Sequence, residues 1–475
     1  MTVAFNSLCF IIIIIIIGDT TNRLLFKNSF CESIFLRLSL AYGLGTGVFS
    51  LLLFYLLYLG LPLNNYTIFC IAVFFVILFV MNKKYFFSGL SFSKLFSLPS
   101  SKKQRIWNGF LSLILLTSLT LIFFKALFLP MHLGDDRAQW GAKAKTIYYE
   151  KTIYSESFKD PQRLQLHAAY PLLIPLLEAS LFSFMKEPND CMVRILFPLY
   201  FTGLLFFIYS SQKRYASHSH SLLFTAMLSV LPVFIKDVNG NPSAGFADVP
   251  LAFYYTVSVL SIFNWFKSKR LKELMLSILF ASFVIFTKQE GLVLWLVVIF
   301  ALGIKVLFGN KNDKTNKYRY LIICLVLPLV VLIPWFQFRS TLSVPPWEKD
   351  WSLSHFSAGY ILSHLNRVLP ILTNMADFCL SIKSWNILCI MFFGVILFCS
   401  KTSFRFPLFF IVSLIFVNTA AVIGATFFYP WVWWPTFLFD LSRLLIMNIP
   451  LIIFFISYAV STDELFKKLK APGRS

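Results

Sequence analysis

Two adjacent carboxylates, Asp135 and Asp136, follow a long apolar run of the sequence. The run ends at Pro130, and a polar segment continues to about His167. A carboxylate is costly inside a lipid bilayer, so an acidic pair at the end of an apolar run favours an exposed catalytic or binding site at a membrane surface. A carboxylate placed there can accept the proton of a hydroxyl group that acts as a nucleophile. The alternative is that the pair is an ordinary part of a polar loop.

Four more charged residues stand where apolar runs begin or are interrupted. Asp248 opens one run, and Lys288 and Glu290 occupy a short break between two others. Arg443 begins the last run and follows Asp440 by about one helical turn. Each has a plain structural interpretation, as a helix cap or first-turn acid at Asp248 and as local ion pairs for the others. The competing hypothesis is a shared site with the acidic pair at the membrane surface.

The composition is that of a polytopic membrane protein. The chain has 475 residues, of which 58% are hydrophobic and 13% charged, and its mean hydropathy is +0.75. Soluble globular domains are far less apolar. The net charge of +21 comes from short basic clusters between apolar runs, which is typical of cytoplasmic loops and argues against a nucleic-acid partner. The eight cysteines show neither a disulfide framework nor metal-type spacing.

The elements that must position the charged residues are therefore transmembrane helices. A helix needs about 20 apolar residues to cross a bilayer. We predict about thirteen spans, at residues 4–17, 34–60, 66–82, 107–129, 191–210, 220–235, 247–266, 273–287, 291–308, 320–337, 384–400, 407–427 and 443–460. The first is short for a span. A signal peptide is disfavoured there, because a basic n-region and a small-residue cleavage site are both missing.

Basic loops alternate along these spans and predict their orientation. The loop between the third and fourth spans carries six basic residues and should be cytoplasmic. The N-terminus is then outside, and the fourth span delivers Asp135 and Asp136 to the outer face. Most of the 21 acidic residues fall on that face, so the chemistry is expected there.

Three parts of the chain follow from this organisation. Residues 1–106 hold the N-terminal spans and the basic loop, residues 107–310 a transmembrane core that carries most of the charged candidates, and residues 311–475 a C-terminal transmembrane region. Two outer loops are long, at 130–190 and 338–383. Loops of that length without a function are uncommon.

The first outer loop contains two predicted helices. Residues 140–149 place Trp140, Ala144 and Ile147 on one face, which predicts an amphipathic helix along the membrane surface. Pro171 can begin the second helix, and Pro175 falls within its first turns, so we expect a short interfacial helix rather than a span. No nucleotide-binding fingerprint occurs in the sequence. A group-transfer enzyme of this kind would receive its donor on a lipid.

Four motifs, all on the predicted outer face, resemble those of a known family. They are Asp135-Asp136 followed by Trp140 and Lys143-Ala144-Lys145; Tyr170-Pro171-Leu172-Leu173 with Pro175; Phe246-Ala247-Asp248-Val249-Pro250-Leu251-Ala252; and Thr287-Lys288-Gln289-Glu290-Gly291. With these motifs in this order, the chain resembles the GT-C-type polytopic membrane glycosyltransferases. It is most similar to the protein O-mannosyltransferase and lipid A aminoarabinose transferase group. The resemblance is best over residues 107–310.

The resemblance implies an all-α, GT-C-like fold and transfer of a sugar, with inversion, from a polyprenyl-phosphate-linked donor. It implies that an aspartate of the first outer loop is the general base, with Asp135 preferred and Asp136 as the alternative. The leaving phosphate is anionic, so cationic side chains should gather near it, and the candidates are Lys143, Lys145, Lys288 and Arg443. The predicted substrate-binding residues further include Tyr170, Asp248 and Glu290.

The implied partners are the lipid bilayer, the lipid-linked sugar and a glycolipid, polysaccharide or protein acceptor. The implied location is the bacterial inner membrane, with the site facing the periplasm or the exterior. No ligand set in the sequence demands a metal, although a divalent cation is left open, and His132 and His167 fit interfacial polar residues better than metal ligands. The rival function is a multi-span transporter or flippase of a lipid-linked saccharide, for which ionisable residues near mid-span and internal repeats would be expected.

Overall fold

The computed structural model describes most of the chain. The described residues are 2–27, 30, 33–81, 101–129, 131, 134–160, 162–163, 166–236, 240–307, 314–342, 357–428, 441 and 443–463. Within these ranges helices are the only regular secondary structure. The all-α class predicted from the composition is confirmed for this part of the chain.

Six helical segments among the described residues are long and apolar enough to cross a membrane. They are α1 (Thr2–Phe26), α2 (Ile34–Tyr58), α5 (Lys102–Phe128), α8 (Leu196–Lys213) with the preceding 3-10 turn η5 (Met192–Ile195), α11 (Asp248–Ser268) and α20 (Leu408–Phe428). They make the chain a polytopic membrane protein. The count of about thirteen spans stays a prediction, because several of the other predicted spans correspond to shorter apolar helices.

The remaining elements are shorter or less apolar. The helices are α3 (Asn65–Met81), α6 (Ala142–Glu150), α7 (Leu173–Met185), α9 (His218–Ser229), α10 (Pro232–Ile235), α12 (Leu271–Thr287), α13 (Glu290–Leu307), α14 (Lys314–Arg339), α16 (Ala358–Ser363), α17 (Val368–Leu380), α18 (Leu388–Phe398), α19 (Ser400–Ser403) and α22 (Ile449–Thr462). The single turns are the π-helical η2 (Asp136–Gly141) and the 3-10 turns η3 (Glu156–Phe158), η7 (Leu365–Arg367) and η9 (Ile446–Asn448).

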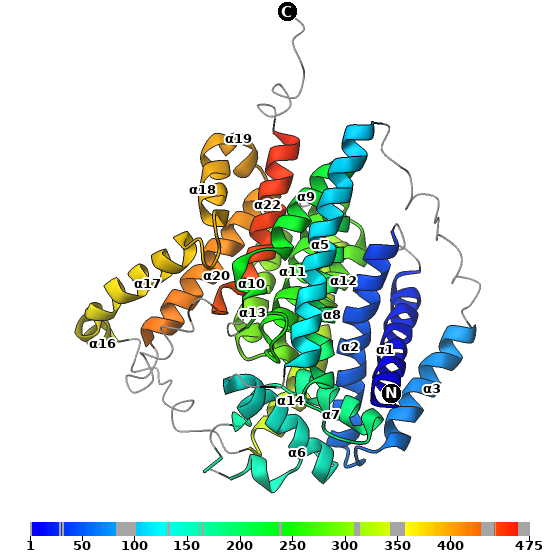
Figure 1. Cartoon of the computed structure of the whole chain (residues 1–475). Coiled ribbons are helices and arrows are strands. Elements are labelled where there is room, and N and C mark those ends of the chain that lie inside the picture. The colour runs from blue at the N-terminus through cyan, green and yellow to red at the C-terminus, as the bar shows by residue number, and fades with distance from the viewer. Residues whose placement is uncertain are drawn as a thin grey trace, which may run out of the picture.

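The segment between α5 and α8 lies at one end of the bundle (Figure 1). Helix α5 begins at the opposite end and runs the length of the molecule before delivering this segment, which contains α6 and α7. Helix α1 begins at the end that carries α6 and α7, and α22 ends at the other (Figure 1). The start of α1 and the first outer loop, which are both predicted to face outward, therefore share one end, while the orientation of that end in a membrane stays a prediction.

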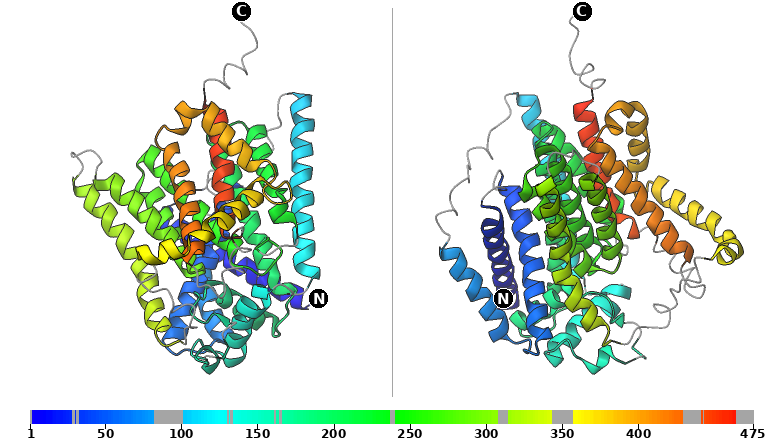
Figure 2. Two further views of the ribbon diagram at one scale, coloured as in Figure 1. Left: turned by 90° about the vertical axis from the view of Figure 1, so that its left-hand side faces the viewer. Right: turned by 180° about the vertical axis from the view of Figure 1, so that it is seen from behind.

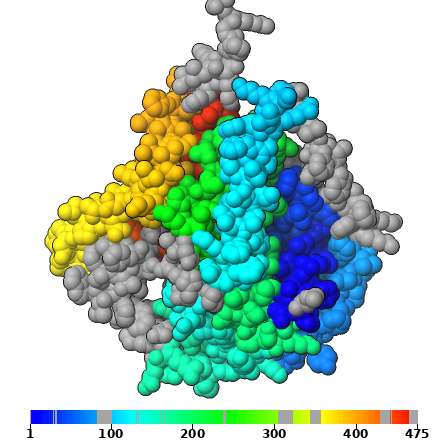
Figure 3. All heavy atoms as spheres, in the orientation of Figure 1, coloured from blue at the N-terminus to red at the C-terminus, as the bar shows by residue number. Residues whose placement is uncertain are grey.

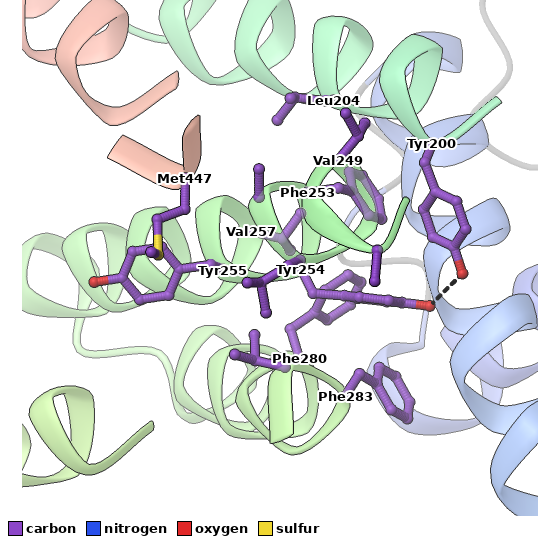
Figure 4. Packing of buried hydrophobic residues seen from close by; sticks show 14 of the residues in the cluster. Tyr200, Leu204, Val249, Phe253, Tyr254, Tyr255, Val257, Phe280, Phe283 and Met447 are labelled. Atoms are coloured by element: carbon purple, nitrogen blue, oxygen red, sulfur yellow. Dashed lines mark hydrogen bonds between the residues drawn. The ribbon is translucent and has the colours of Figure 1, made fainter. Parts of the chain in front are cut away.

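Helix α11 lies at the centre of the bundle, and α5 on its outside. The whole apolar window of α11 is buried, whereas α5 exposes large apolar side chains along the molecular surface (Figure 3). The pair α13 and α14 lies at the side away from α5 (Figure 2). In Figure 4 the hydroxyl groups of Tyr254 on α11 and Tyr200 on α8 meet at 3.0 Å, among packed aromatic rings. This enclosed packing fixes α11, whose first residue is Asp248.

The first predicted span, 4–17, is too short. Helix α1 continues to Phe26, through Asp19 and Arg23. The Asp19 carboxylate accepts from Arg23 Nε at 2.8 Å and from Arg37 Nε of α2 at 2.7 Å. Because these charges are paired inside the bundle, the polar residues do not end the helix.

The predicted span 220–235 is not one helix. Helix α9 ends at Ser229, and Pro232 begins the separate short helix α10. A proline has no N–H to donate to the preceding turn, and its ring collides with that turn, so the helix breaks here.

The two helices predicted in the first outer loop exist, but they begin later. Helix α6 begins at Ala142, because η2 occupies the residues before it, and it buries Ala144 and Ile147 as the pattern predicted. Helix α7 begins at Leu173 instead of Pro171, and it is buried over almost its whole length against α1, α2 and α6. The expectation of an interfacial helix there was wrong, because α7 is mostly apolar and packs inside the protein.

The second predicted outer loop, 338–383, is partly helical. Helix α14 continues to Arg339, and α16 and α17 follow within the loop. Helix α17 keeps only Ile371 buried, and it extends away from the body of the molecule (Figure 1).

Reporter fusions can test the orientation. A topology reporter placed after residue 95 or 315 is expected to be cytoplasmic, and one placed after residue 155 or 360 external, because basic loops stay on the cytoplasmic side. The measurement is the activity of a compartment-specific reporter enzyme in intact cells. An external reporter at 315 would contradict the scheme and place the candidate site on the wrong face.

Candidate active site

Five charged residues from four separate segments form one ion network. Asp135 directly precedes η2, and Asp248 is the first residue of α11. Lys288 and Glu290 stand at the junction of α12 and α13, and Arg443 lies shortly before η9. All five are residues that the sequence marked as candidates, and the fold brings them together.

The network is a chain of alternating charges. Arg443 Nη1 lies 2.6 Å from Asp135 Oδ2, and Arg443 Nε lies 3.5 Å from Asp248 Oδ2. The other oxygen of Asp248, Oδ1, accepts from Lys288 Nζ at 3.0 Å. Lys288 Nζ also lies 3.0 Å from Glu290 Oε1. The Lys288–Glu290 pair predicted from spacing is therefore present, but it is one link of a longer chain.

The network is buried in the middle and open at its two ends. The side chains of Asp248 and Lys288 are each 4% exposed, and that of Arg443 is 11% exposed. The terminal carboxylates, Asp135 and Glu290, are 36% and 30% exposed. The groups that an incoming molecule would meet first are thus the two carboxylates.

The neighbouring carboxylates favour the protonated form of the buried Lys288. Burial alone would lower the pKa of Lys288, but the carboxylates of Asp248 and Glu290 outweigh it and raise that pKa above its ordinary value. Asp248 and Glu290 are also the first residues of α11 and α13, where the helix dipole favours a negative charge. The predicted role of Asp248 as a first-turn acid is therefore compatible with its place in the network.

The loop before α11 shapes the contacts of Arg443. Gly240 has a φ of +83°, and a Cβ there would lie 2.8 Å from Arg443 Cγ, so only glycine suits both the backbone and the space. The guanidinium carbon of Arg443 lies 5.1 Å from the centre of the Phe246 ring, within the range of a cation–π contact. Residues 240–248 thus pack against Arg443 through three of their members, Gly240, Phe246 and Asp248.

Asp136 faces inward, unlike its neighbour Asp135. It is fully buried, and a Cβ on Gly245 would lie only 3.0 Å from its own Cβ. Glu178 of α7 is also fully buried. Burial, followed by the nearby charges of Asp136 and Asp190, raises the pKa of Glu178 well above its ordinary value and favours its protonated form. The two adjacent aspartates therefore occupy different environments.

A second group of candidates lies apart from the network. Lys143 is fully buried, and its Nζ donates to the carbonyl of His167 at 3.1 Å. The same Nζ lies 4.9 Å from the centre of the Trp140 ring and 5.6 Å from that of Tyr170. Lys145 Nζ pairs with Asp190 Oδ1 at 2.8 Å. These contacts fold the first outer loop onto itself, and none of them joins the ion network.

A hydrogen bond connects the segments that carry the two groups. Gln289 Nε2, between Lys288 and Glu290, donates to the carbonyl of Ala169 at 3.2 Å. Ala169 directly precedes Tyr170, so the fourth sequence motif contacts the residue just before the second. The spacing of the motifs along the chain does not reveal this contact.

The structure adds residues that the sequence did not mark for the site. They are Glu178 beside Asp136, Gly240 and Gly245 in the loop before α11, and Arg194, whose contacts are described below. Among the residues that the structure describes, no group of three or more His, Cys, Asp and Glu side chains could hold a metal ion. Two of the residues considered above, His132 and Asp440, lie outside the described residues. The predicted pair of Asp440 with Arg443 therefore stays a prediction.

Comparisons with known proteins give few parallels. No protein-family model and no curated protein matches the chain. Among solved structures, the chain is similar to the oligosaccharyltransferase of Archaeoglobus fulgidus, crystallised while tethered with an acceptor peptide containing the NVT sequon. The TM-score is 0.46 at 10% identity, over 76% of this chain and 50% of that one.

A crystal structure of the same Archaeoglobus enzyme in complex with Zn and sulfate gives a TM-score of 0.44 at 11% identity, over 75% of this chain and 49% of that one. The chain thus spans about half the length of the enzyme it matches.

Proposed function

We propose that the chain is an inverting glycosyltransferase of the GT-C type. It moves a sugar from a polyprenyl-phosphate-linked donor to a glycolipid, polysaccharide or protein acceptor at the outer face of a bacterial inner membrane. The observation that carries this proposal is the ion network. Residues 135, 248, 288, 290 and 443 meet at one place, with two carboxylates open to an incoming substrate.

Asp135 is the proposed general base. The acceptor hydroxyl is a poor nucleophile until its proton is taken, and a base must come within hydrogen-bond reach of it. Asp135 is partly exposed and binds Arg443 through Oδ2, so its other oxygen can receive a proton. Asp136 is fully buried and does not reach an acceptor in this conformation. Its proposed role is to support the turn from which Asp135 projects.

Arg443 is the proposed contact for the leaving phosphate. A cation placed where negative charge develops lowers the barrier to bond cleavage. Arg443 is the more exposed of the two cations in the network, and it already orients Asp135. Lys288 is almost enclosed, and we propose that it acts through Glu290 and Asp248. Lys143 and Lys145 are engaged within the first outer loop, so we do not assign them the phosphate.

Transfer in liposomes tests the proposal. In liposomes, the purified protein is supplied with a set of polyprenyl-phosphate sugars. In cells with and without the protein, envelope glycolipids and glycoproteins are compared by mass spectrometry. The expected result is one class of acceptor that carries a sugar only when the protein is present. If movement of the lipid-linked sugar across the bilayer is observed without transfer, the flippase alternative replaces the glycosyltransferase.

The outer carboxylate of the network gives a specific prediction. Glu290→Gln is expected to slow transfer by roughly tenfold to a hundredfold, which corresponds to loss of one charge-assisted hydrogen bond. Asp248 still balances Lys288 in this variant, so the protein should fold and insert normally. The measurement is the transfer rate at saturating donor.

A matched control separates this effect from a general change in charge. Glu156→Gln removes an exposed carboxylate of the first outer loop, which pairs with Lys159 of that loop. It should transfer at the wild-type rate. Wild-type turnover in Glu290→Gln as well would return Glu290 to a purely structural ion pair.

A further inference from the structure

Arg194 is a buried cation that ties two site-bearing segments together. It lies in η5, ahead of α8, and its side chain is fully buried. Its Nη1 donates to the carbonyl of Leu129, and its Nη2 donates to the carbonyl of Ser243. Leu129 caps the end of α5, just before the acidic pair, and Ser243 stands in the loop that leads to Asp248.

The geometry of the guanidinium fixes the separation of the two carbonyls that it binds. Its N–H groups point in fixed directions in one plane, so two carbonyls bound to Nη1 and Nη2 are held at a set separation. A buried guanidinium is costly to desolvate, and loss of its hydrogen bonds would leave that cost uncompensated. Both segments therefore lose stability if either carbonyl moves away.

The loop is built to present its carbonyl to Arg194. Asn241 Oδ1 accepts from the backbone N–H groups of Ser243 at 2.6 Å and Ala244 at 2.9 Å, which closes a tight turn. Two residues beyond Ser243, Gly245 passes close to Asp136. The loop thus meets the segment of the acidic pair twice, through Arg194 and by direct contact.

We propose that Arg194 is a positioning residue of the ion network. It fixes the end of α5 against the loop before α11, so that Asp135 and Asp248 lie on either side of Arg443. Arg443 joins the same two segments through its contacts with Asp135 and Asp248. The proposal rests on the proposed function only where sugar transfer is the readout.

Hydrogen exchange tests the positioning without any assay of activity. In the full-length protein in nanodiscs, Arg194→Met is expected to raise amide exchange in peptides that cover residues 129–141 and 240–248. Arg367→Met is the matched control, because Arg367 is a second buried arginine whose Nη1 donates to a backbone carbonyl, that of Phe427 at 2.7 Å. Its effect should stay near α17 and α20. Unchanged exchange in either site segment of Arg194→Met would overturn the proposal.

Transfer kinetics test the consequence for chemistry. Displacement of a catalytic group by about 1 Å can cost about 10²-fold in rate, so Arg194→Met should lower kcat by about that factor while the KM for the donor changes little. Arg194→Lys keeps a donor and the charge and should recover part of the loss. Equal losses of kcat in Arg194→Met and Arg367→Met would mark Arg194 as an ordinary buried residue.

Variants of Asn241 test the same link if Arg194→Met does not fold. Asn241→Leu removes the acceptor that holds the turn of Ser243, and Asn241→Asp keeps that acceptor oxygen. The leucine variant should loosen residues 240–248 and lower kcat, and the aspartate variant should do so less. If the wild type transfers no sugar, the proposed function fails, and the exchange data alone still decide whether Arg194 positions the two segments.

Discussion

Replacement of Asp135 by asparagine is expected to slow sugar transfer by roughly 10²–10⁴-fold, the typical cost of losing a general base. Asparagine keeps the shape of the side chain and an oxygen that can accept from Arg443, so the network should keep its geometry. The Asp135–Arg443 pair is partly exposed, and such pairs contribute only about 0–1 kcal/mol to stability. Expression, insertion and donor binding should therefore be close to wild type.

Asp136→Asn is the matched control, because it makes the same change at the adjacent, fully buried position. Its effect on transfer should be smaller than that of Asp135→Asn, and it should act through the packing against Gly245 and the charge beside Glu178. The assay is transfer from a polyprenyl-phosphate donor in liposomes. Near wild-type rates in both variants would remove the assigned base, whereas a larger loss in Asp136→Asn would exchange the two roles.

The difference between the two aspartates could not be predicted from the sequence. Both follow the same apolar run. Without the conformation of the turn, the sequence does not show which of the two side chains faces the protein interior. The turn is π-helical, and it directs Asp136 inward while Asp135 stays partly exposed. In that inward position Asp136 packs close to Gly245, a residue far away in the sequence.

Sequence reasoning found the charged members of the network one by one, through a single rule. A charge at the edge of an apolar run is costly unless it has a partner or a function. The rule marked Asp248, Lys288, Glu290 and Arg443 and allowed a site shared with the acidic pair, but the ion pairs that spacing predicted were local. Arg443 was paired with Asp440 by spacing, whereas in the described contacts it binds Asp135, at a sequence separation of 308. Long-range partners of this kind come from helix packing.

Arg194 was missed for a different reason. Its partners are backbone carbonyls. Because every residue has a backbone carbonyl, no pattern of side chains in the sequence predicts which carbonyls are bound. The extent of α1 was missed because Asp19 pairs with both Arg23 and Arg37 inside the bundle. In both cases the sequence shows a charge that looks out of place, and the contact that explains it lies on another element.

Lys288→Met is expected to destabilise the protein by about 3–5 kcal/mol, the usual cost of removing one partner of a buried ion pair. Methionine keeps the length of the side chain but leaves Asp248, which is 4% exposed, with only the Arg443 contact at 3.5 Å. Glu290 loses its cation as well, although it is partly exposed and water can replace that contact. The measurement is the free energy of unfolding in detergent.

The double variant Lys288→Met/Asp248→Asn separates stability from chemistry. It removes one cation and one anion, so the network keeps its net charge of minus one, and no buried carboxylate is left without its ammonium. Replacement of both partners of a buried pair is often close to neutral, so most of the lost stability should return. Recovered stability with transfer still lost would mean that these charges serve the reaction. Recovered stability with wild-type transfer would reduce Asp248 and Lys288 to a structural pair and confine the site to Asp135, Glu290 and Arg443.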